Sequence, residues 1–276
     1  MQKVDRLDWA AGFSLKSYGV RIGIRSNDPA YLARVREHLP HNWENVSSPI
    51  VDRLYSIVIG GEGPRPNIRR LNLLYGNHVR LARSFEVEEV FNTLESDLRL
   101  FVAELARGRV FVHAGVVGWQ GRAVVVPGRS FSGKSTLVAE LVRAGATYYS
   151  DEYAVFDSRG HVHPFPGPLQ IRQEGGFKQT KIDVAQLGGR PGSKPLPVGL
   201  VLVTHFKKGA RWRPRNLSSG AGALELLSNT VSARRSPANA LDAFDNVVAG
   251  AQIVKGTRGE ANEIVPFILD QLGKNR

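Results

Sequence analysis

Residues 128–135 read Gly-Arg-Ser-Phe-Ser-Gly-Lys-Ser and fit the pattern G-x-x-x-x-G-K-[ST] at every fixed position. This pattern is typical of a P-loop, in which glycines let backbone N–H groups approach phosphate oxygens. Lys134 can reach the β- and γ-phosphates, and Ser135 can bind Mg²⁺ through its hydroxyl. The sequence therefore predicts ATP and Mg²⁺ as cofactors. The expected nucleotide-binding residues are Gly128, Arg129, Ser130, Phe131, Ser132, Gly133, Lys134, Ser135 and Thr136.

The residues around this loop favour the same interpretation over a chance match. Residues 123–126 are Ala-Val-Val-Val, a short apolar run typical of a strand. Residues 135–144 (STLVAELVRA) have helical character, and Gly145 is a good helix stop. Phosphates bound by the loop would lie at the N-terminus of a helix, where free N–H groups and the dipole favour anions.

Composition limits the class of protein. The chain has 276 residues, 42% of them hydrophobic, which is enough for one large or two modest domains with a proper core. It has no cysteine, so disulfides and thiolate zinc sites are excluded. The N-terminus has no apolar leader region, and no run approaches the length of a membrane span. We expect a soluble, cytoplasmic protein without a membrane partner.

The chain is strongly basic, with a formal net charge of +12 and a sequence pI of 10.2. Such a charge is compatible with nucleic acid or acidic partners. The cations form several short groups with only Trp212 interleaved, which does not favour nucleic-acid binding, and part of the excess can serve ATP and an acidic substrate segment. The groups are Arg69, Arg70, Arg80 and Arg83; Lys207, Lys208, Arg211, Arg213 and Arg215; and Arg234 and Arg235.

The pattern of strands and helices divides the chain into residues 1–108 and residues 109–276. The first part is expected to be an α+β region without a chemical constellation, serving as scaffold, oligomerisation or substrate-presentation element. Its apolar patterns predict a strand within 13–26, a helix over 28–38, a loop over 40–49, a strand at 51–59, a loop at 60–66, strands at 71–75 and 78–84, and an amphipathic helix over 85–107.

The second part is expected to be an α/β domain built around the loop. Residues 174–197 are polar and rich in glycine and proline, which indicates an excursion without regular structure. The predicted elements are strands at 109–118, 123–127, 147–156 and 198–206, a turn at 158–160, and helices at 238–249 and 260–272.

The predicted hairpin places His113 near the phosphate-binding loop. If Gln120 and Gly121 form a two-residue turn, opposed residues have numbers that sum to 241. His113 then lies opposite Gly128, and its imidazole can approach the phosphates. A bulge would change this register, and a packed structural histidine is the alternative.

Asp151 and Glu152 follow Lys134 after one helix and one short strand. In a parallel sheet this places them at the same edge as the loop. One carboxylate can help Ser135 hold Mg²⁺, and the other can accept a proton from an attacking hydroxyl. The alternative is a solvated strand end. The apolar run 198–206 ends in Thr204-His205 without the carboxylate of an ordinary Walker B strand, which leaves the metal role to the acidic pair.

Arg172 and Arg258 are the candidates for stabilising charge on the transferred phosphate, with a surface or structural ion pair as the alternative for each. The aromatic residues near the loop, by contrast, are interpreted as packing residues outside the site. They are Trp119, Tyr148, Tyr149 and Tyr153.

Residues 113–152 resemble the catalytic domain of the HPr kinase/phosphorylase family. The shared features are a histidine 15 residues before the first loop glycine, the G-x-x-x-x-G-K-S loop, and the acidic pair after the helix. The chain departs from the family pattern at Glu152, where the family usually has Asp, and at Gln170, where it has Glu. Residues 1–108 do not resemble the family's usual N-terminal domain.

The resemblance implies a P-loop variant fold related to phosphoenolpyruvate carboxykinase, in a divergent member with a different substrate. It implies that Asp151 is the base acting on a protein serine, that Glu152 and Ser135 serve the metal, and that His113 assists at the phosphates. Together with the loop, this predicts an ATP- and Mg²⁺-dependent kinase with catalytic residues Asp151, Lys134 and His113 and a peptide or protein substrate.

Two alternatives to the kinase remain open from sequence, namely a nucleotide-binding regulatory module without transfer activity and a small-molecule kinase. Self-association of the chain also stays open.

Overall fold

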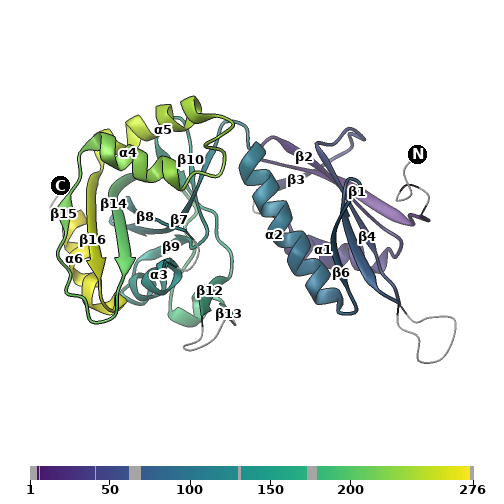
Figure 1. Ribbon diagram of the computed structural model, residues 1–276, viewed down its shortest axis with the longest axis horizontal. Helices are drawn as coiled ribbons and strands as arrows, with labels where there is room; N and C mark the ends of the chain where they lie inside the picture. The colour runs from purple at the N-terminus through teal and green to yellow at the C-terminus, as the bar shows by residue number, and fades with distance from the viewer. Residues whose placement is uncertain are drawn as a thin grey trace. The chain divides into compact units, whose positions relative to one another are not determined.

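The computed structural model describes Asp5 and residues 7–40, 42–61, 70–129, 132–172 and 179–273. The chain forms two compact units, Met1–Arg107 and Gly108–Arg276 (Figure 1). Each unit has its own sheet and its own hydrophobic core. Among the described residues, no helix combines the length and the apolar character needed to span a bilayer.

The N-terminal unit is a six-stranded sheet with two helices. The strand order is β3-β1-β2-β4-β5-β6, and only β2 and β4 pair in parallel among these neighbours. The elements are β1 (Ala11–Ser17), β2 (Val20–Ser26), α1 (Ala30–Val35) with the 3₁₀ turn η2 (Arg36–His38), β3 (Trp43–Val46), β4 (Arg53–Val58), β5 (Asn72–Gly76), β6 (Val79–Ser84) and α2 (Val87–Leu105).

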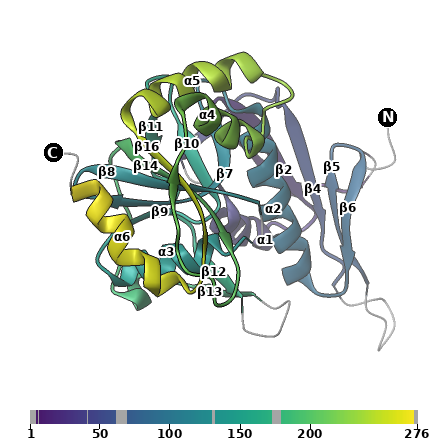
Figure 2. The same cartoon turned by 60° about the vertical axis from the view of Figure 1, so that its left-hand side comes forward.

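The core of this unit lies between the sheet and helix α2. Val90, Leu94 and Leu98 follow the helical period and are fully buried, as the amphipathic pattern predicts. They join Ile22 and Ile57 from the strands in one cluster. Figure 2 shows α1 and α2 on the same side of this sheet.

One prediction for this unit needs correction: residues 40–49 are not all loop, because Trp43–Val46 pair with β1 as strand β3. The strand predicted within 13–26 is confirmed as β2, and the preceding strand β1 joins it through a turn at Tyr18 and Gly19, which have positive φ values of 48° and 82°. Pairing with a distant partner created β3, and such pairing leaves no local periodicity in the sequence.

The C-terminal unit is a mixed α/β fold around an eight-stranded sheet. Its strands run in the order β11-β10-β7-β8-β14-β16-β15, with β9 also paired to β7 and a further pairing between β11 and β14. A separate two-stranded sheet joins β12 to β13. The strands are β7 (Val110–Trp119), β8 (Arg122–Pro127), β9 (Thr147–Ser150), β10 (Tyr153–Phe156), β11 (His161–His163), β12 (Leu169–Arg172), β13 (Gln179–Ile182), β14 (Leu196–Phe206), β15 (Arg215–Asn216) and β16 (Gln252–Arg258).

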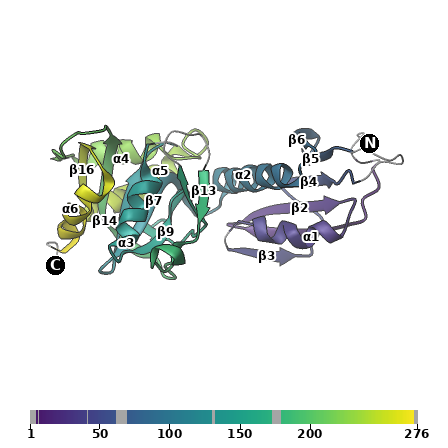
Figure 3. The ribbon, with the colours of Figure 1, turned by 90° about the horizontal axis from the view of Figure 1, so that it is seen from below.

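Helices cover both faces of this sheet (Figures 1 and 3). Helices α3 (Lys134–Arg143) and α6 (Ala261–Gly273) pack in one apolar cluster with Leu200 and Leu202 of β14. Helices α4 (Ser219–Ser228) and α5 (Pro237–Gly250) pack in the other, with Val201 and Ile253. The alternation along β14 separates the two cores, as expected for a strand buried on both faces.

A topological switch point lies between β8 and β14. These two strands are parallel neighbours, with Val201 opposite Val125. The helix that follows β8 is α3, whereas the helix that follows β14 is α4, on the opposite face. In open α/β sheets, ligands bind outside the carboxyl ends of strands at such a point. The carboxyl end of β8 carries residues 128–135.

Two predictions for this unit were also wrong. Residues 147–156 are two strands, because Ser150 Oγ accepts hydrogen bonds from the N–H groups of Glu152 and Tyr153 and bends the chain. Residues 174–197 contain strand β13, a 3₁₀ turn η3 (Val184–Leu187) and the start of β14, while residues 173–178 lie outside the described residues. Strands β11, β12, β15 and β16 and helix α4 were not predicted.

Candidate functional site

The Gly128–Ser135 loop connects β8 to α3 with a tight backbone path. Gly133 has a φ of 84° and immediately precedes the helix, a conformation that glycine adopts without steric cost. A Cβ at Gly128 would lie 2.8 Å from Ser132 Oγ, so a larger residue would collide there. Ser130 and Phe131, which the sequence places in the nucleotide site, lie outside the described residues. Thr136 is exposed on the first turn of α3.

Lys134 turns back into the loop. Its side chain is largely buried, with 9% of the residue exposed, and Nζ donates a 2.7 Å hydrogen bond to the Arg129 carbonyl. Burial lowers the pKa of Lys134 from 10.5 to about 8, and the negative charge of Asp151 opposes this shift. The Asp151 charge therefore does not fully offset the cost of burying the Lys134 ammonium. An anion that bound beside this ammonium would stabilise its positive charge.

The hairpin register that places His113 beside the loop is confirmed. Ala114 pairs with Pro127 and Trp119 with Arg122, around the turn at Gln120 and Gly121. The Gly128 N–H donates to the His113 carbonyl at 3.0 Å. The register is fixed because both turn residues have positive φ, the conformation of a type I′ turn.

The His113 imidazole is partly buried between an aromatic ring, that of Tyr153, and the positive charge of Lys134. Its ring centroid is 5.0 Å from that of Tyr153. Burial lowers the pKa of His113, and the nearby Lys134 charge lowers it further. The ring is therefore neutral at neutral pH and can donate one hydrogen bond while accepting another.

Asp151 is held by groups from three parts of the chain. Its Oδ2 accepts a 3.1 Å hydrogen bond from Ser135 Oγ, at the start of α3, and a 3.0 Å bond from the Gln170 N–H. Its Oδ1 lies 3.0 Å from the Tyr148 hydroxyl. The residue that sequence predicts as a proton acceptor thus contacts the residue predicted to bind metal. The reason is the sheet: Ser150 of β9 and Val125 of β8 both oppose Val116, so both strands end at one edge.

Tyr148 belongs to this site, although the sequence led to its interpretation as a packing residue. Its ring is buried, and its hydroxyl lies 3.0 Å from both Asp151 Oδ1 and the Gly167 carbonyl. Burial raises the pKa of Tyr148, as does the Asp151 charge, so the phenol keeps its proton and donates it. Only its position three residues before Asp151 could have suggested this contact.

Glu152 occupies the bend between β9 and β10. Its N–H donates to Ser150 Oγ, and its carbonyl accepts from the Ala114 N–H at 3.1 Å. The residue is partly exposed. Its proposed contribution to metal binding stays a prediction.

Arg258 reaches the loop from β16. The residue is 2% exposed, its Nη2 donates a 2.9 Å hydrogen bond to the Gly133 carbonyl, and its Nη1 donates to the Gly259 carbonyl at 3.0 Å. The guanidinium also lies over the Phe206 ring, 5.3 Å from its centroid. Burial lowers the pKa of Arg258, opposed by Glu260. Of the two arginines that the sequence singled out, Arg258 contacts the loop, and the Arg172 side chain lies outside the described residues.

Two polar atoms beside the loop have no partner within the described residues. They are Ser132 Oγ and Arg258 Nε, both inaccessible to water. Buried polar atoms are normally hydrogen-bonded, and an unpaired one costs free energy. An anion in the loop is the kind of ligand that would satisfy such donors.

The described part of the chain holds no cluster of side chains typical of a protein-only metal site. Among the described residues, no group of three or more His, Cys, Asp or Glu side chains is arranged to hold a metal ion. Mg²⁺ commonly binds through one or two protein oxygens together with substrate phosphates and water. The Ser135 hydroxyl at the start of α3 suits that mode of binding, with the partly exposed Glu152 as the predicted carboxylate ligand.

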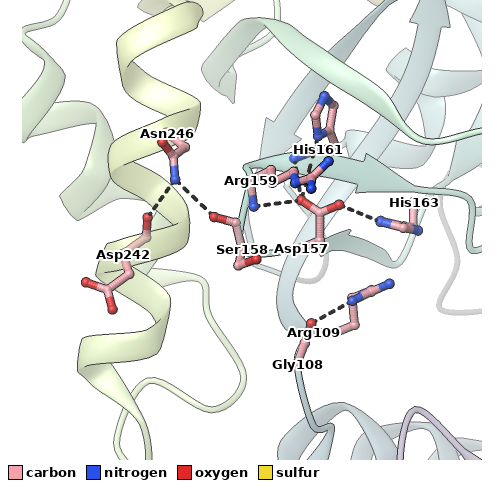
Figure 4. Close-up of polar contacts among 9 residues, drawn as sticks. All are labelled: Gly108, Arg109, Asp157, Ser158, Arg159, His161, His163, Asp242 and Asn246. Atoms are coloured by element: carbon pink, nitrogen blue, oxygen red, sulfur yellow. Dashed lines mark hydrogen bonds and ion pairs between the residues drawn. The ribbon is translucent and has the colours of Figure 1, made fainter.

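A polar cavity of about 540 Å³ lies away from the loop, near the start of β7 and the β10–β11 turn. Its lining includes Arg109, Asp157, Arg159 and Lys194. Asp157 Oδ1 accepts from the N–H groups of Arg159 and His161, and Oδ2 lies 2.9 Å from His163 Nε2 (Figure 4). These hydrogen bonds are typical of a turn in which the side chain of the first residue, Asp157, accepts from backbone N–H groups that follow it. The cluster is thus accounted for by local structure.

No protein-family model matches the sequence, and no curated protein matches it. Among solved structures, the chain is similar to the Hpr(Ser) kinase/phosphatase from Coxiella burnetii, with 17% sequence identity and a TM-score of 0.32 over 60% of this chain and 94% of that chain. A likeness at this level establishes neither a shared fold nor a shared activity.

Proposed function

We propose that this protein is an ATP- and Mg²⁺-dependent phosphotransferase that moves the γ-phosphoryl group to a hydroxyl, such as a serine of a peptide or protein. The observation that carries the proposal is the 3.1 Å hydrogen bond between Ser135 and Asp151. It brings a carboxylate to the N-terminus of α3, directly beneath a G-x-x-x-x-G-K-S loop. A base beside the phosphate site serves transfer, whereas binding alone does not need one.

Phosphate binding would use the groups that now hold the loop. The N–H groups at the start of α3 and the positive end of its dipole favour an anion. The Lys134 ammonium and the Arg258 guanidinium currently donate to loop carbonyls at Arg129 and Gly133. Both can add or exchange a contact toward phosphate oxygens, which would compensate their buried charge.

The transfer step conserves atoms and charge in a simple way. The acceptor oxygen forms a bond to the γ-phosphorus, the bond from that phosphorus to the β–γ bridging oxygen breaks, and ADP leaves with its electron pair. The acceptor proton passes to the Asp151 carboxylate. The Gln170 N–H and the Tyr148 hydroxyl hold that carboxylate in place. His113 lies close enough to Lys134 for the two side chains to interact electrostatically. Ser135 and Glu152 would hold Mg²⁺, which would neutralise phosphate charge and leave the Asp151 carboxylate free to accept the proton.

The test combines nucleotide binding with transfer in the full-length protein. ATP affinity is measured by calorimetry with Mg²⁺ present, and transfer is measured with γ-labelled ATP and a protein lysate as the source of hydroxyl groups. Asp151→Asn should keep ATP affinity within a few-fold and lower labelling by about 100- to 10,000-fold, the usual contribution of a general base. Lys134→Met should lose most of the affinity.

A matched control lies at the other end of the same helix. Arg143 is half exposed and about 13 Å along α3 from Lys134, so Arg143→Ala should change neither quantity. If Asp151→Asn labels at the wild-type rate, another residue is the base. If the wild type binds ATP but labels nothing, the protein is a nucleotide-binding module without transfer activity. If it does not bind ATP, the proposal is wrong.

A further inference from the structure

A basic cavity of about 450 Å³ opens at the carboxyl ends of β14 and β16. His205, Arg213, Arg215, Lys255 and Thr257 contribute to its lining. None of these residues has a role in the phosphate site described above. The cavity is therefore a second feature of the same sheet edge.

The cavity opens at the same sheet edge as the phosphate-binding loop. Strand β14 lies beside β8 in parallel register, and neighbouring strands are about 4.8 Å apart, so the carboxyl end of β14 reaches the level of residues 127–129. From β16, Arg258 contacts the Gly133 carbonyl, and the adjacent Thr257 lines the cavity. Because side chains alternate along a strand, Thr257 points to the other face of the sheet, so a molecule in the cavity would reach the loop across this edge.

The cations of this surface outnumber the carboxylates beside it, where Glu263 approaches the segment near Gly259 and Ala210. Residues 207–215 read Lys-Lys-Gly-Ala-Arg-Trp-Arg-Pro-Arg, with five cations and no carboxylate. Across the described part of the chain, the guanidinium groups of Arg213 and Arg215 form no ion pair or hydrogen bond. Lys255, on the neighbouring strand, is paired with Glu225. The uncompensated positive charge therefore gathers on residues 207–215 and the cavity that they border.

We infer that this basic surface, His205 to Arg215 with the cavity beside it, docks an acidic peptide segment that carries the acceptor hydroxyl. The inference rests on the proposed phosphotransferase function and adds a substrate class to it. An extended peptide can place one carboxylate on Arg213, another on Arg215, and further ones along residues 207–211. A single small anion cannot span that length.

The aromatic residues nearby argue for a peptide over a nucleic acid. Single-stranded nucleic acids are usually bound by exposed aromatic rings on which bases stack. The Trp212 ring instead packs inward, since a Cβ at Gly256 would lie 2.6 Å from it and the Phe267 ring meets it edge-on at 5.6 Å. One face of the Phe206 ring is covered by the Arg258 guanidinium. The surface offers charge and a single exposed Phe ring, Phe206 at 41%, and not the series of rings on which successive bases stack.

The inference is tested by fluorescence anisotropy with the full-length protein and a labelled peptide of alternating Glu and Asp around one serine. A peptide with Gln and Asn in place of the acids is the neutral probe. We expect the acidic peptide to bind more tightly than the neutral one, with affinity falling as salt rises. The double variant Arg213→Gln/Arg215→Gln should lose about tenfold in affinity, the effect of two exposed charge pairs. Both side chains are exposed, so the fold should persist, and circular dichroism checks this.

Two further variants separate this inference from the proposed function. Arg143→Gln removes an exposed charge elsewhere and should leave peptide affinity unchanged. Lys134→Met should also leave it unchanged, even though it abolishes ATP binding. Peptide binding that depends on Arg213 and Arg215 supports the docking surface even if no phosphate is transferred.

Other outcomes would overturn the docking surface. These are equal binding of acidic and neutral peptides, wild-type affinity in the double variant, equal loss in Lys134→Met, or tighter binding of a single-stranded oligonucleotide of the same charge.

Discussion

Replacing Lys134 with methionine should stabilise the nucleotide-free protein while removing its capacity to bind ATP. Methionine has a similar length and fills the same buried position without a charge. Lowering the pKa of Lys134 from 10.5 to about 8 corresponds to about 3 kcal/mol of unfavourable free energy for the charged side chain in the folded protein. Loss of the hydrogen bond to the Arg129 carbonyl offsets about 1 kcal/mol of the gain. At pH 7 the variant should be about 2 kcal/mol more stable.

The pH dependence gives this prediction its sign. In the unfolded chain Lys134 keeps its proton up to about pH 10.5, whereas in the folded protein it loses the proton near pH 8. Between these values the unfolded state binds more protons, so the stability of the wild type rises with pH. The methionine variant lacks this contribution. The difference in unfolding free energy should therefore be constant below pH 8 and shrink between pH 8 and 10.5.

Hydrogen exchange of the amides in β8 and α3 measures this difference in the unit that contains the loop. Lys194→Met is the matched control, because Lys194 is exposed and surface changes usually alter stability by less than about 0.5 kcal/mol. A methionine variant that is less stable than the wild type at pH 7, or a difference that does not shrink above pH 8, would refute the claim that burial of this charge is costly.

Two further substitutions test the geometry of the site. Gly133→Ala should destabilise the protein by more than Gly121→Ala in urea titrations: both glycines have φ near 80°, but only a Cβ at Gly133 would lie 2.5 Å from Arg258 Nη2. Equal losses of unfolding free energy would show that the Arg258 side chain moves aside at no cost. Tyr148→Phe should lower the rate of phosphate transfer more than ATP affinity, because the hydroxyl orients Asp151 without facing the loop, and a change confined to affinity would contradict that role.

The parts of the site that sequence could predict are those that follow from local chemistry. The loop, the helix after it and the type I′ turn each have a short signature, and the turn then fixes the register from Trp119–Arg122 to Ala114–Pro127. The position of Asp151 needed one more step, namely that strands β8 and β9 both pair antiparallel with β7. Because both are antiparallel to β7, β8 and β9 run in the same direction and end at the same edge of the sheet.

The remaining parts depend on contacts between distant segments. Tyr148 looks like any buried strand tyrosine, and its contact with Gly167 requires the chain after β11 to pass beneath it. Arg258 lies 125 residues beyond Gly133, and only the parallel pairing of β14 with β16 brings it to the loop. The bend at Asp151 has a local cause, the Ser150 hydroxyl, but the flanking β-forming residues favour one continuous strand.

The two cations at the loop explain why this site would respond to an anion. Without an anion, Lys134 and Arg258 donate hydrogen bonds to the carbonyls of Arg129 and Gly133. The negative charges of Asp151 and Glu260 only partly offset the cost of burying these two cations. Neutral carbonyls stabilise a buried cation less than a phosphate does. An anion that enters the loop therefore gains more from these side chains than the carbonyls lose, because the carbonyls can be solvated at the loop surface.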